Sequence, residues 1–360
     1  MAGNINAPRG TLDVLPTESY KWQFIEKIAL EVAKDYGYNE MRTPVFEHTE
    51  LFLRGVGDTT DVVSKEMYTF RDKGERSVTL KPEGTAGIAR AAIERGLLND
   101  ALPFKASYIT PCFRYDKPQA GRYREFHQFG IEAIGSESPA IDAEVIAMAY
   151  DIIDRLSLEN ITLFINSIGC PECRAKYHQS LKLYFENVKD SLCSTCRERL
   201  EKNPMRILDC KSDICQNLGA SAPVMLDFLC DDCSQHFSLV KSLLQAANIP
   251  FQIDPKIVRG LDYYTKTVFE FVASDIGLTV CGGGRYDGLI QELGGNKLPG
   301  IGFAAGLERL LLVTAKQNVD IPKLTECELY IASIGEKANI KAYELATILR
   351  RDGVYVEFDV

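Results

Sequence analysis

Apolar residues recur along this chain with two different periods, and segments of the two kinds alternate. Spacing of three to four residues predicts amphipathic helices at 22–32, 86–95, 140–156 and 338–351. Runs of β-branched and aromatic residues between turn formers predict strands at 39–46, 67–70, 77–80, 108–110, 123–133, 161–166, 268–271, 328–333 and 354–358. A further strand runs straight into a helix across 299–310. Neighbouring strands are joined as hairpins, so the pattern predicts an α+β protein.

One long region departs from this alternation. The stretch from 167 to 250 is mostly helical and holds eight of the eleven cysteines, which predicts a helical domain inserted into a β-rich core. The chain is therefore expected to divide into a first part of the core (1–166), the insert (167–250), a second part of the core (251–322) and a partial α/β unit (323–360).

The strands around residues 108–133 form a hairpin that carries candidate chemistry. Residues two apart in a strand share a face, so Gln128 and Glu132 point the same way, with Gly130 between them as an open floor. The opposite face is expected to be core and consists of Phe129, Ile131 and Ala133, with His127 on that side and given no role. The hairpin thus presents one carboxylate and one amide on a single surface.

Three arginines border this surface: Arg114, at the end of the incoming strand, and Arg122 and Arg124, at the start of the outgoing one. A guanidinium can grip a phosphate with two parallel hydrogen bonds, and a carboxylate suits an ammonium group. The ordinary alternative is a hairpin with a solvated charged face.

Composition narrows the class of protein. With 46% apolar and 25% charged residues among 360, the chain is that of a globular protein large enough for more than one domain. Its N-terminus lacks the layout of a signal peptide and no apolar run reaches membrane-spanning length, so a cytoplasmic protein without a membrane partner is expected. The net charge of −9 argues against a general nucleic-acid binder and leaves room for a local basic patch.

The cysteines of the insert come in closely spaced pairs, at Cys170/Cys173, Cys193/Cys196, Cys210/Cys215 and Cys230/Cys233. Two such pairs can supply the four thiolates of a structural zinc site, whereas disulfides are disfavoured in a reducing compartment. Buried free thiols are the alternative. Which pairs share a site is left open. If pairs that are close in sequence combine, Cys193/Cys196 would join Cys210/Cys215, and Cys170/Cys173 would join Cys230/Cys233.

Several stretches resemble the histidyl-tRNA synthetase family, one of the class II aminoacyl-tRNA synthetases. FRYDKPQAGRYREFHQFG at 113–130 resembles motif 2, PGIGFAAGLERL at 299–310 resembles motif 3, and the helix and strand at 22–46 resemble motif 1, which builds the dimer interface. LKPEGTA at 80–86, RGLDYYT at 259–265 and CGGGRYDGL at 281–289 resemble the histidine-specific signatures. The resemblance covers essentially the whole chain in the right order.

The resemblance implies a class II fold, with a mixed, mainly antiparallel sheet of six or seven strands flanked by helices. It implies that Arg114 and Arg259 are catalytic, holding the reacting α-phosphate and carboxylate. Arg122 and Arg309 join Arg114 in binding ATP, with Mg²⁺. The implied histidine contacts are Glu83, Gly84, Thr85, Gln128, Glu132, Arg259, Tyr263 and Tyr264. Without the resemblance, each of these patterns has an ordinary interpretation. Tyr263 and Tyr264 would be core residues, and Glu83 would be a favourable charge at the start of a helix. The three glycines at 282–284 would form a flexible turn.

The implied reaction forms histidyl-adenylate from L-histidine and ATP, then transfers the histidyl group to tRNA(His), in a homodimer. No motif residue lies between Cys170 and Cys233, so loss of metal is expected to leave activation largely intact. The segment 323–360 resembles the start of the anticodon-binding domain, so efficient activation and poor charging of tRNA are expected. The alternatives are a catalytically inactive paralogue, the regulatory subunit of ATP phosphoribosyltransferase in histidine biosynthesis, and a histidine-binding module without catalysis.

Overall fold

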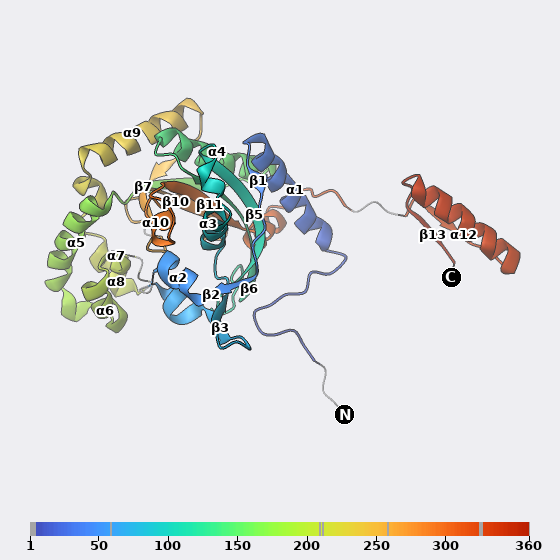
Figure 1. Ribbon diagram of the computed structural model, residues 1–360, viewed down its shortest axis with the longest axis horizontal. Helices are drawn as coiled ribbons and strands as arrows, with labels where there is room; N and C mark the ends of the chain where they lie inside the picture. The colour runs from blue at the N-terminus through green and yellow to red at the C-terminus, as the bar shows by residue number, and fades with distance from the viewer. Residues whose placement is uncertain are drawn as a thin grey trace. The chain divides into compact units, whose positions relative to one another are not determined.

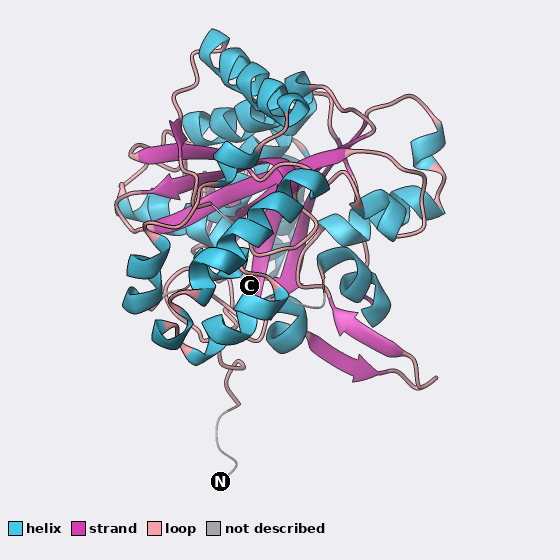
Figure 2. Cartoon of the chain, turned by 90° about the vertical axis from the view of Figure 1, so that its left-hand side faces the viewer, coloured by secondary structure: helices cyan, strands magenta, loops and turns pink. Residues whose placement is uncertain are grey.

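The structure, a computed structural model, describes residues 5–57, 60–208, 210, 212–257, 259–323 and 327–359. Its centre is an eight-stranded sheet (Figures 1 and 2). In spatial order the strands are β1 (Asn39–Glu40), β5 (Phe104–Phe113), β6 (Glu125–Ile134), β11 (Gly300–Gly306), β10 (Leu278–Arg285), β9 (Thr265–Ala273), β7 (Ile161–Ser167) and β8 (Gln252–Ile253).

The sheet is antiparallel through its middle and parallel only at its two edges, where β1 pairs with β5 and β8 pairs with β7. The mainly antiparallel arrangement is confirmed. The expected number of six or seven strands is wrong, because β1 and β8 are two-residue strands too short to show a periodic pattern. The pairing of β6 with β11 sets Glu132 opposite Gly302, and Gln128 opposite Gly306.

A second sheet of three strands, β2 (Phe46–His48), β4 (Ser77–Leu80) and β3 (Tyr68–Arg71), belongs to the same compact unit. The strand expected over 39–46, broken at Pro44, is found as two short strands that belong to different sheets. The chain leaves the central sheet after Glu40 and enters the small sheet at Phe46. Pro44 lies between the two strands, and a proline cannot donate to a sheet ladder.

Helices pack around the central sheet (Figure 2). α4 (Pro139–Arg155) contacts β10 and β11, α9 (Asp231–Ala246) contacts α4 and β9, and α11 (Leu307–Lys316) contacts β6, β10 and β11. α4 begins where its sequence predicts, because the Ser138 side chain accepts a hydrogen bond from the Ala140 N–H and proline is the first helical residue. The other helices of the core are α1 (Ser19–Asp35), α2 (Thr49–Val56), α3 (Thr85–Glu94) and α10 (Leu289–Glu292).

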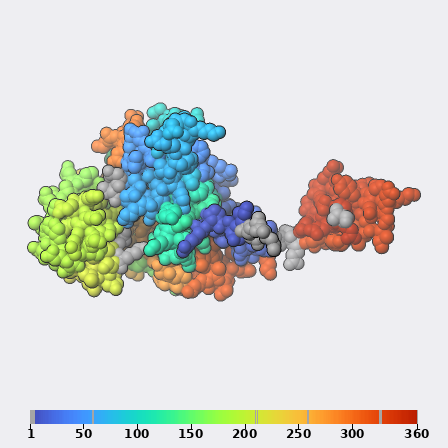
Figure 3. All heavy atoms as spheres, turned by 90° about the horizontal axis from the view of Figure 1, so that it is seen from below, coloured from blue at the N-terminus to red at the C-terminus, as the bar shows by residue number. Residues whose placement is uncertain are grey.

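The region between β7 and β8 is helical, as expected, and consists of α5 (Pro171–Glu186), α6 (Ser194–Lys202), α7 (Met205–Leu208), α8 (Asp213–Gly219) and α9. In the space-filling view its green and yellow atoms gather into one lobe (Figure 3). This region nevertheless belongs to the same compact unit as the sheet. One hydrophobic cluster contains Leu181 and Leu200 of the lobe together with Tyr263, Tyr264 and Tyr286 of the core, so the lobe is anchored through buried apolar contacts.

The last segment forms the expected βαβ unit, with β12 (Leu329–Ile331) parallel to β13 (Val356–Phe358) and joined to it by α12 (Glu336–Arg351). Residues 15–24 and 320–360 form a second compact unit. Among the described residues, none of the helices is long and apolar enough to cross a membrane.

Candidate active site

A cavity of about 370 Å³ opens on the central sheet. Its walls come from the turn before α3, the loop between β5 and β6, the loop 259–264, and the strands β9, β10 and β11. These are the segments that the sequence marked as candidates. Glu83, Thr85, Arg114, Arg122, Gln128, Arg259, Tyr263, Tyr264 and Arg309 all line it. The fold therefore gathers residues that are more than 200 positions apart in the sequence.

Glu83 lines this cavity and is buried. Its two carboxylate oxygens accept the backbone N–H groups of Thr85, at 2.8 Å, and Ala86, at 2.9 Å, which are the first donors of α3. The Glu83 side chain therefore both accepts the first N–H groups of α3 and lines the cavity. Burial raises the pKa of Glu83 despite these hydrogen bonds. Gly84 does not line the cavity; a Cβ there would lie 2.3 Å from the Tyr108 ring.

Glu132 lies one layer beneath the cavity lining and is almost fully buried. It accepts hydrogen bonds from the hydroxyl of Tyr108, at 3.0 Å, and from that of Tyr286, which does line the cavity. Gly302 of the paired strand leaves the necessary room, because a Cβ there would lie 2.1 Å from Glu132 Oε2. Burial raises the pKa of Glu132 to about 8, and the nearby Glu83 adds to the shift.

Aromatic rings form a wall next to the two carboxylates. The ring centroids of Tyr263 and Tyr264 are 4.7 Å apart, and Tyr263 meets Tyr286 edge-on at 5.8 Å. All three side chains are buried and belong to the hydrophobic core. The same tyrosines therefore pack in the core and line the cavity. Gln128 faces the same space, and its side-chain oxygen lies 3.3 Å from Cys112 Sγ.

A second group of residues that line the cavity is cationic. Arg114 donates to the Pro82 carbonyl at 2.9 Å, and Arg122 pairs with Asp116 at 3.1 Å. Arg309 donates to the Gly121 carbonyl at 3.0 Å. Each guanidinium is thus held by an acceptor from the protein, and its remaining N–H groups are available to a ligand.

Burial lowers the pKa of Arg309, and the positive charges of Arg122, Arg114 and Arg259 lower it further. Four guanidiniums therefore share one small volume, where they repel one another. Such a cluster is stabilised by a polyanion, and arginine forks match phosphate oxygens well. This cationic group suits a triphosphate.

Arg259 also lines the cavity. It forms an ion pair with Glu270 of β9, whose other oxygen accepts the Thr279 hydroxyl at 3.0 Å, while the buried Arg259 Nε has no hydrogen-bond partner within the described chain. Gly282 lies beneath it, since a Cβ there would be 2.5 Å from Arg259 Nη1. The glycine triplet is therefore part of strand β10, and the flexible turn considered as its alternative is wrong.

Two expectations about the hairpin need correction. Arg124 does not line the cavity: its guanidinium stacks on Tyr115, 4.0 Å from the ring centroid, and donates to the Asp116 carbonyl. His127 is only partly buried, and its Nδ1 lies 3.1 Å from Glu308. The hairpin twists where the strands end, so simple alternation fails at those positions.

Sequence reasoning also missed residues that complete the site. Glu270, Tyr108 and Tyr286 hold Arg259 and Glu132 in place. The only sequence signal for Glu270 was a single acidic residue inside an otherwise apolar strand. Arg206, from the helical lobe, lines the cavity as well, and nothing in its sequence surroundings connects it to the core.

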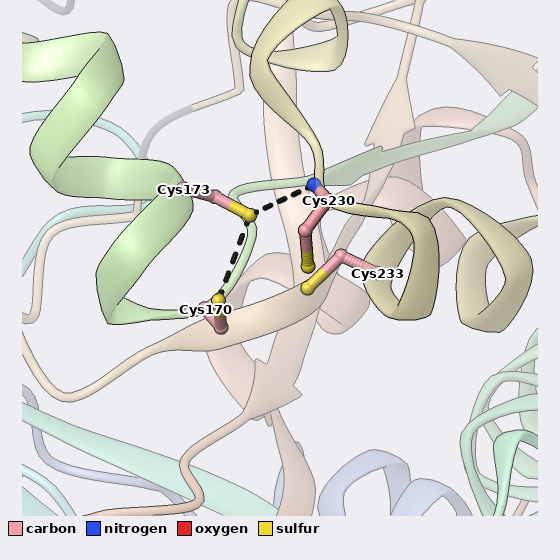
Figure 4. Close-up of side chains that lie close together, drawn as sticks. All are labelled: Cys170, Cys173, Cys230 and Cys233. Carbon is pink, nitrogen blue, oxygen red and sulfur yellow. Dashed lines mark hydrogen bonds between the residues drawn. The ribbon is translucent and has the colours of Figure 1, made fainter.

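The eight cysteines of the lobe form two groups of four. One contains Cys170, Cys173, Cys230 and Cys233, and the other Cys193, Cys196, Cys210 and Cys215; within each group all sulfurs lie within 4.8 Å of one another. Figure 4 shows the first group, in which the pair at the start of α5 faces the pair at the start of α9. The structure thus decides the pairing that the sequence left open.

Comparison with known proteins agrees with these features. Residues 10–172 and 211–310 match the family model described as histidyl-tRNA synthetase. A histidine–tRNA ligase of Clostridium novyi (strain NT) is 54% identical over 355 residues, spanning 99% of this chain and 85% of that protein. One from Desulforamulus reducens is 55% identical over 354 residues, spanning 98% and 84%.

Solved structures agree as well. The crystal structure of apo S. aureus histidyl-tRNA synthetase superposes with a TM-score of 0.83 at 40% identity, covering 99% of this chain and 85% of that one. A structure titled as an ATP phosphoribosyltransferase regulatory subunit/histidyl-tRNA synthetase from Bacillus halodurans gives a TM-score of 0.74 at 21% identity, covering 100% of this chain and 93% of the other. At that identity the second likeness shows the fold alone.

Proposed function

The chain belongs to the histidyl-tRNA synthetase family, and from this premise we propose how its residues carry out the family's reaction. The enzyme activates L-histidine with ATP to histidyl-adenylate and transfers the histidyl group to tRNA(His). The observation that carries our assignment of roles is that one cavity brings carboxyl groups and aromatic rings together with four guanidiniums.

Histidine lies against the carboxyl groups and the aromatic rings. Glu83 and Gln128 accept the substrate ammonium group with the Thr85 hydroxyl, and Tyr263 and Tyr264 enclose the imidazole ring. Glu132 supplies negative charge from beneath. Burial raises the pKa of both carboxyl groups, to about 8 for Glu132, and a bound cation favours their ionised forms. The substrate carboxylate then points toward Arg259.

ATP lies against the four guanidiniums. Arg114 and Arg259 hold the α-phosphate and the histidine carboxylate, while Arg122 and Arg309 hold the β- and γ-phosphates. Magnesium accompanies the triphosphate, with phosphate oxygens and water as its preferred ligands. The four guanidiniums are preorganised by protein anchors, so stabilising the developing charge requires little rearrangement.

In the first step a histidine carboxylate oxygen attacks the α-phosphorus and pyrophosphate leaves, with no proton transfer at the reacting atoms. In the second step a terminal ribose hydroxyl of tRNA attacks the adenylate carbonyl, its proton passes to a phosphate oxygen of the departing AMP, and AMP leaves with the electron pair of the broken bond. Positioning and charge stabilisation suffice for activation, which is why we assign no catalytic histidine.

Histidine-dependent exchange of pyrophosphate into ATP tests this function directly. Exchange should require histidine, and charging of tRNA(His) should follow when tRNA is added. The regulatory paralogue is disfavoured because close relatives are ligases and because the ATP-binding arginines are present. Absence of exchange, together with binding to ATP phosphoribosyltransferase in a pull-down, would overturn the assignment.

We also propose that each group of four cysteines binds one structural zinc ion. Four cysteines with mutually close sulfurs match the donor set that tetrahedral zinc prefers, and each group joins helices of the lobe that are separated in sequence. Three backbone N–H groups point at sulfur, from Cys230 to Cys173 at 3.1 Å, from Cys193 to Cys215 at 3.4 Å and from Ser212 to Cys210 at 3.5 Å, as expected around thiolates. The zinc would have no part in the chemistry of the reacting atoms.

The homodimer is likewise our proposal. Phe46 and Phe70, on the three-stranded sheet, expose about half of their side-chain surface, which an interface would cover. Light scattering of the purified protein should give twice the chain mass, and a single chain mass at micromolar concentration would contradict it.

A further inference from the structure

We infer that Arg206, in the helical lobe, is a positioning residue for the histidine pocket, and that the second cysteine group fixes it in place. This inference rests on the proposed function, because it concerns the loop 259–264 that carries Arg259, Tyr263 and Tyr264. The lobe would then set the affinity for histidine, in contrast to the expectation that metal loss there leaves activation largely intact.

The contact is an ion pair in the middle of that loop. Arg206 Nη2 donates to Asp262 Oδ1 at 3.0 Å, and only 11% of the Arg206 side chain and 27% of the Asp262 side chain are exposed. The Asp262 N–H also donates to the Val56 carbonyl at 3.2 Å, so the loop is held between α2 and the lobe. Asp262 therefore attaches the loop to the lobe and to α2, while its neighbours Leu261 and Tyr263 line the cavity.

A second contact joins the lobe to Asp61, which also lines the cavity. Arg199 Nη2 lies 3.0 Å from Asp61 Oδ2, and Arg199 Nη1 donates to the Arg206 carbonyl at 3.0 Å. Burial alone would raise the pKa of Asp61, yet Lys65, Arg199 and Arg206 together lower it. The two arginines thus form one basic unit between Asp61 and Asp262.

The second cysteine group brackets this basic unit. Cys193 precedes α6 and Cys196 lies in its first turn, while the Cys210 N–H donates to the Ile207 carbonyl at the end of α7. Cys196 and Cys215 are fully buried. Residues 197–208, which contain the rest of α6 and all of α7, therefore lie between two cysteine pairs of the group, and one ion bound by both pairs would restrict the freedom of Arg199 and Arg206.

A double-mutant cycle of Arg206→Ala and Asp262→Asn tests the contact. Each single variant should weaken histidine binding measured by calorimetry by roughly tenfold, which corresponds to about 1.4 kcal/mol, and should raise the KM for histidine in pyrophosphate exchange. ATP affinity should stay within about twofold. The double variant should bind histidine no more weakly than either single one, and Arg206→Lys should recover most of the affinity.

The exposed ion pair between Lys182 and Glu201, at 2.7 Å, provides the matched control, because it joins α5 to α6 within the lobe. Lys182→Ala should leave histidine binding unchanged. Additive losses in the double-mutant cycle, or unchanged histidine affinity in Arg206→Ala, would overturn the positioning role. Absence of exchange activity in the wild-type enzyme would instead overturn the proposed function.

Cys193→Ser tests the part played by the cysteine group. Its zinc content should fall by one equivalent, and its histidine affinity should fall as in Arg206→Ala, with no further loss when the two changes are combined. A variant that loses the zinc but keeps wild-type histidine affinity would refute the link between this group and the loop.

Discussion

Histidine binding should release a proton from Glu132. In the free enzyme the pKa of this carboxyl is about 8, mainly because burial disfavours the charged form. At pH 7 roughly nine in ten molecules would therefore carry the proton. A bound histidine brings a cation within a few ångströms, which favours the carboxylate and drives the proton into the buffer.

The magnitude follows from the same pKa. Ionising a group of pKa about 8 at pH 7 costs about 1.4 kcal/mol, and this cost is subtracted from the binding free energy. The cost vanishes as the pH rises above the pKa. The contribution of Glu132 should therefore tighten histidine binding roughly fiftyfold between pH 6 and pH 8.

Calorimetry in buffers of different ionisation enthalpy measures the proton release. The wild type should release about 0.9 proton more at pH 7 than Glu132→Gln, in which the substrate's own titrations remain but this one is removed. Glu132→Gln should also weaken histidine binding and leave ATP binding nearly intact. Equal proton release by the two proteins would show that Glu132 is charged in the free enzyme or protonated in the complex, and would refute this account.

Further outcomes can be measured independently. Because the folded-state pKa of Glu132 lies above its ordinary 4.5, stability of the ligand-free enzyme should fall by up to a few kcal/mol as the pH rises from about 4.5 to 8, and denaturant titrations of Glu132→Gln should not show that fall. Arg259→Ala should slow pyrophosphate exchange on the order of a hundredfold while barely changing histidine affinity; exchange within about twofold of wild type would remove Arg259 from the mechanism. Gly130→Ala should weaken histidine binding and cost about 1–3 kcal/mol of stability, because the new Cβ would lie 2.3 Å from the Tyr108 ring; unchanged binding and melting temperature would count against the tight packing there. Elemental analysis should find two zinc ions per chain, and less than a tenth of an equivalent with eight titratable thiols would favour free cysteines.

Much of the site could be predicted because its residues lie in short local patterns. Alternation along β6 predicted that Gln128 and Glu132 share one face, and the resemblance of 299–310 to motif 3 predicted a strand that runs into the helix carrying Arg309. Side-chain directions were predicted wrongly where a strand twists, and strand bounds were predicted poorly where the chain crosses from one sheet to another. Arg124 turned onto Tyr115, and the strand at 39–46 divided between two sheets.

The sequence by itself determined the type of each long element, the segments that would carry chemistry and the pairwise spacing of the cysteines, because these depend on neighbours within a few positions. Only the tertiary structure decided which cysteine pairs join, that Glu270 holds Arg259, and that Arg206 of the lobe reaches the histidine loop. Burial, which raises the pKa of Glu132, also depends on strands and helices distant in sequence. Contacts of this kind join residues far apart along the chain, so no local pattern records them; they exist only once the whole core has packed.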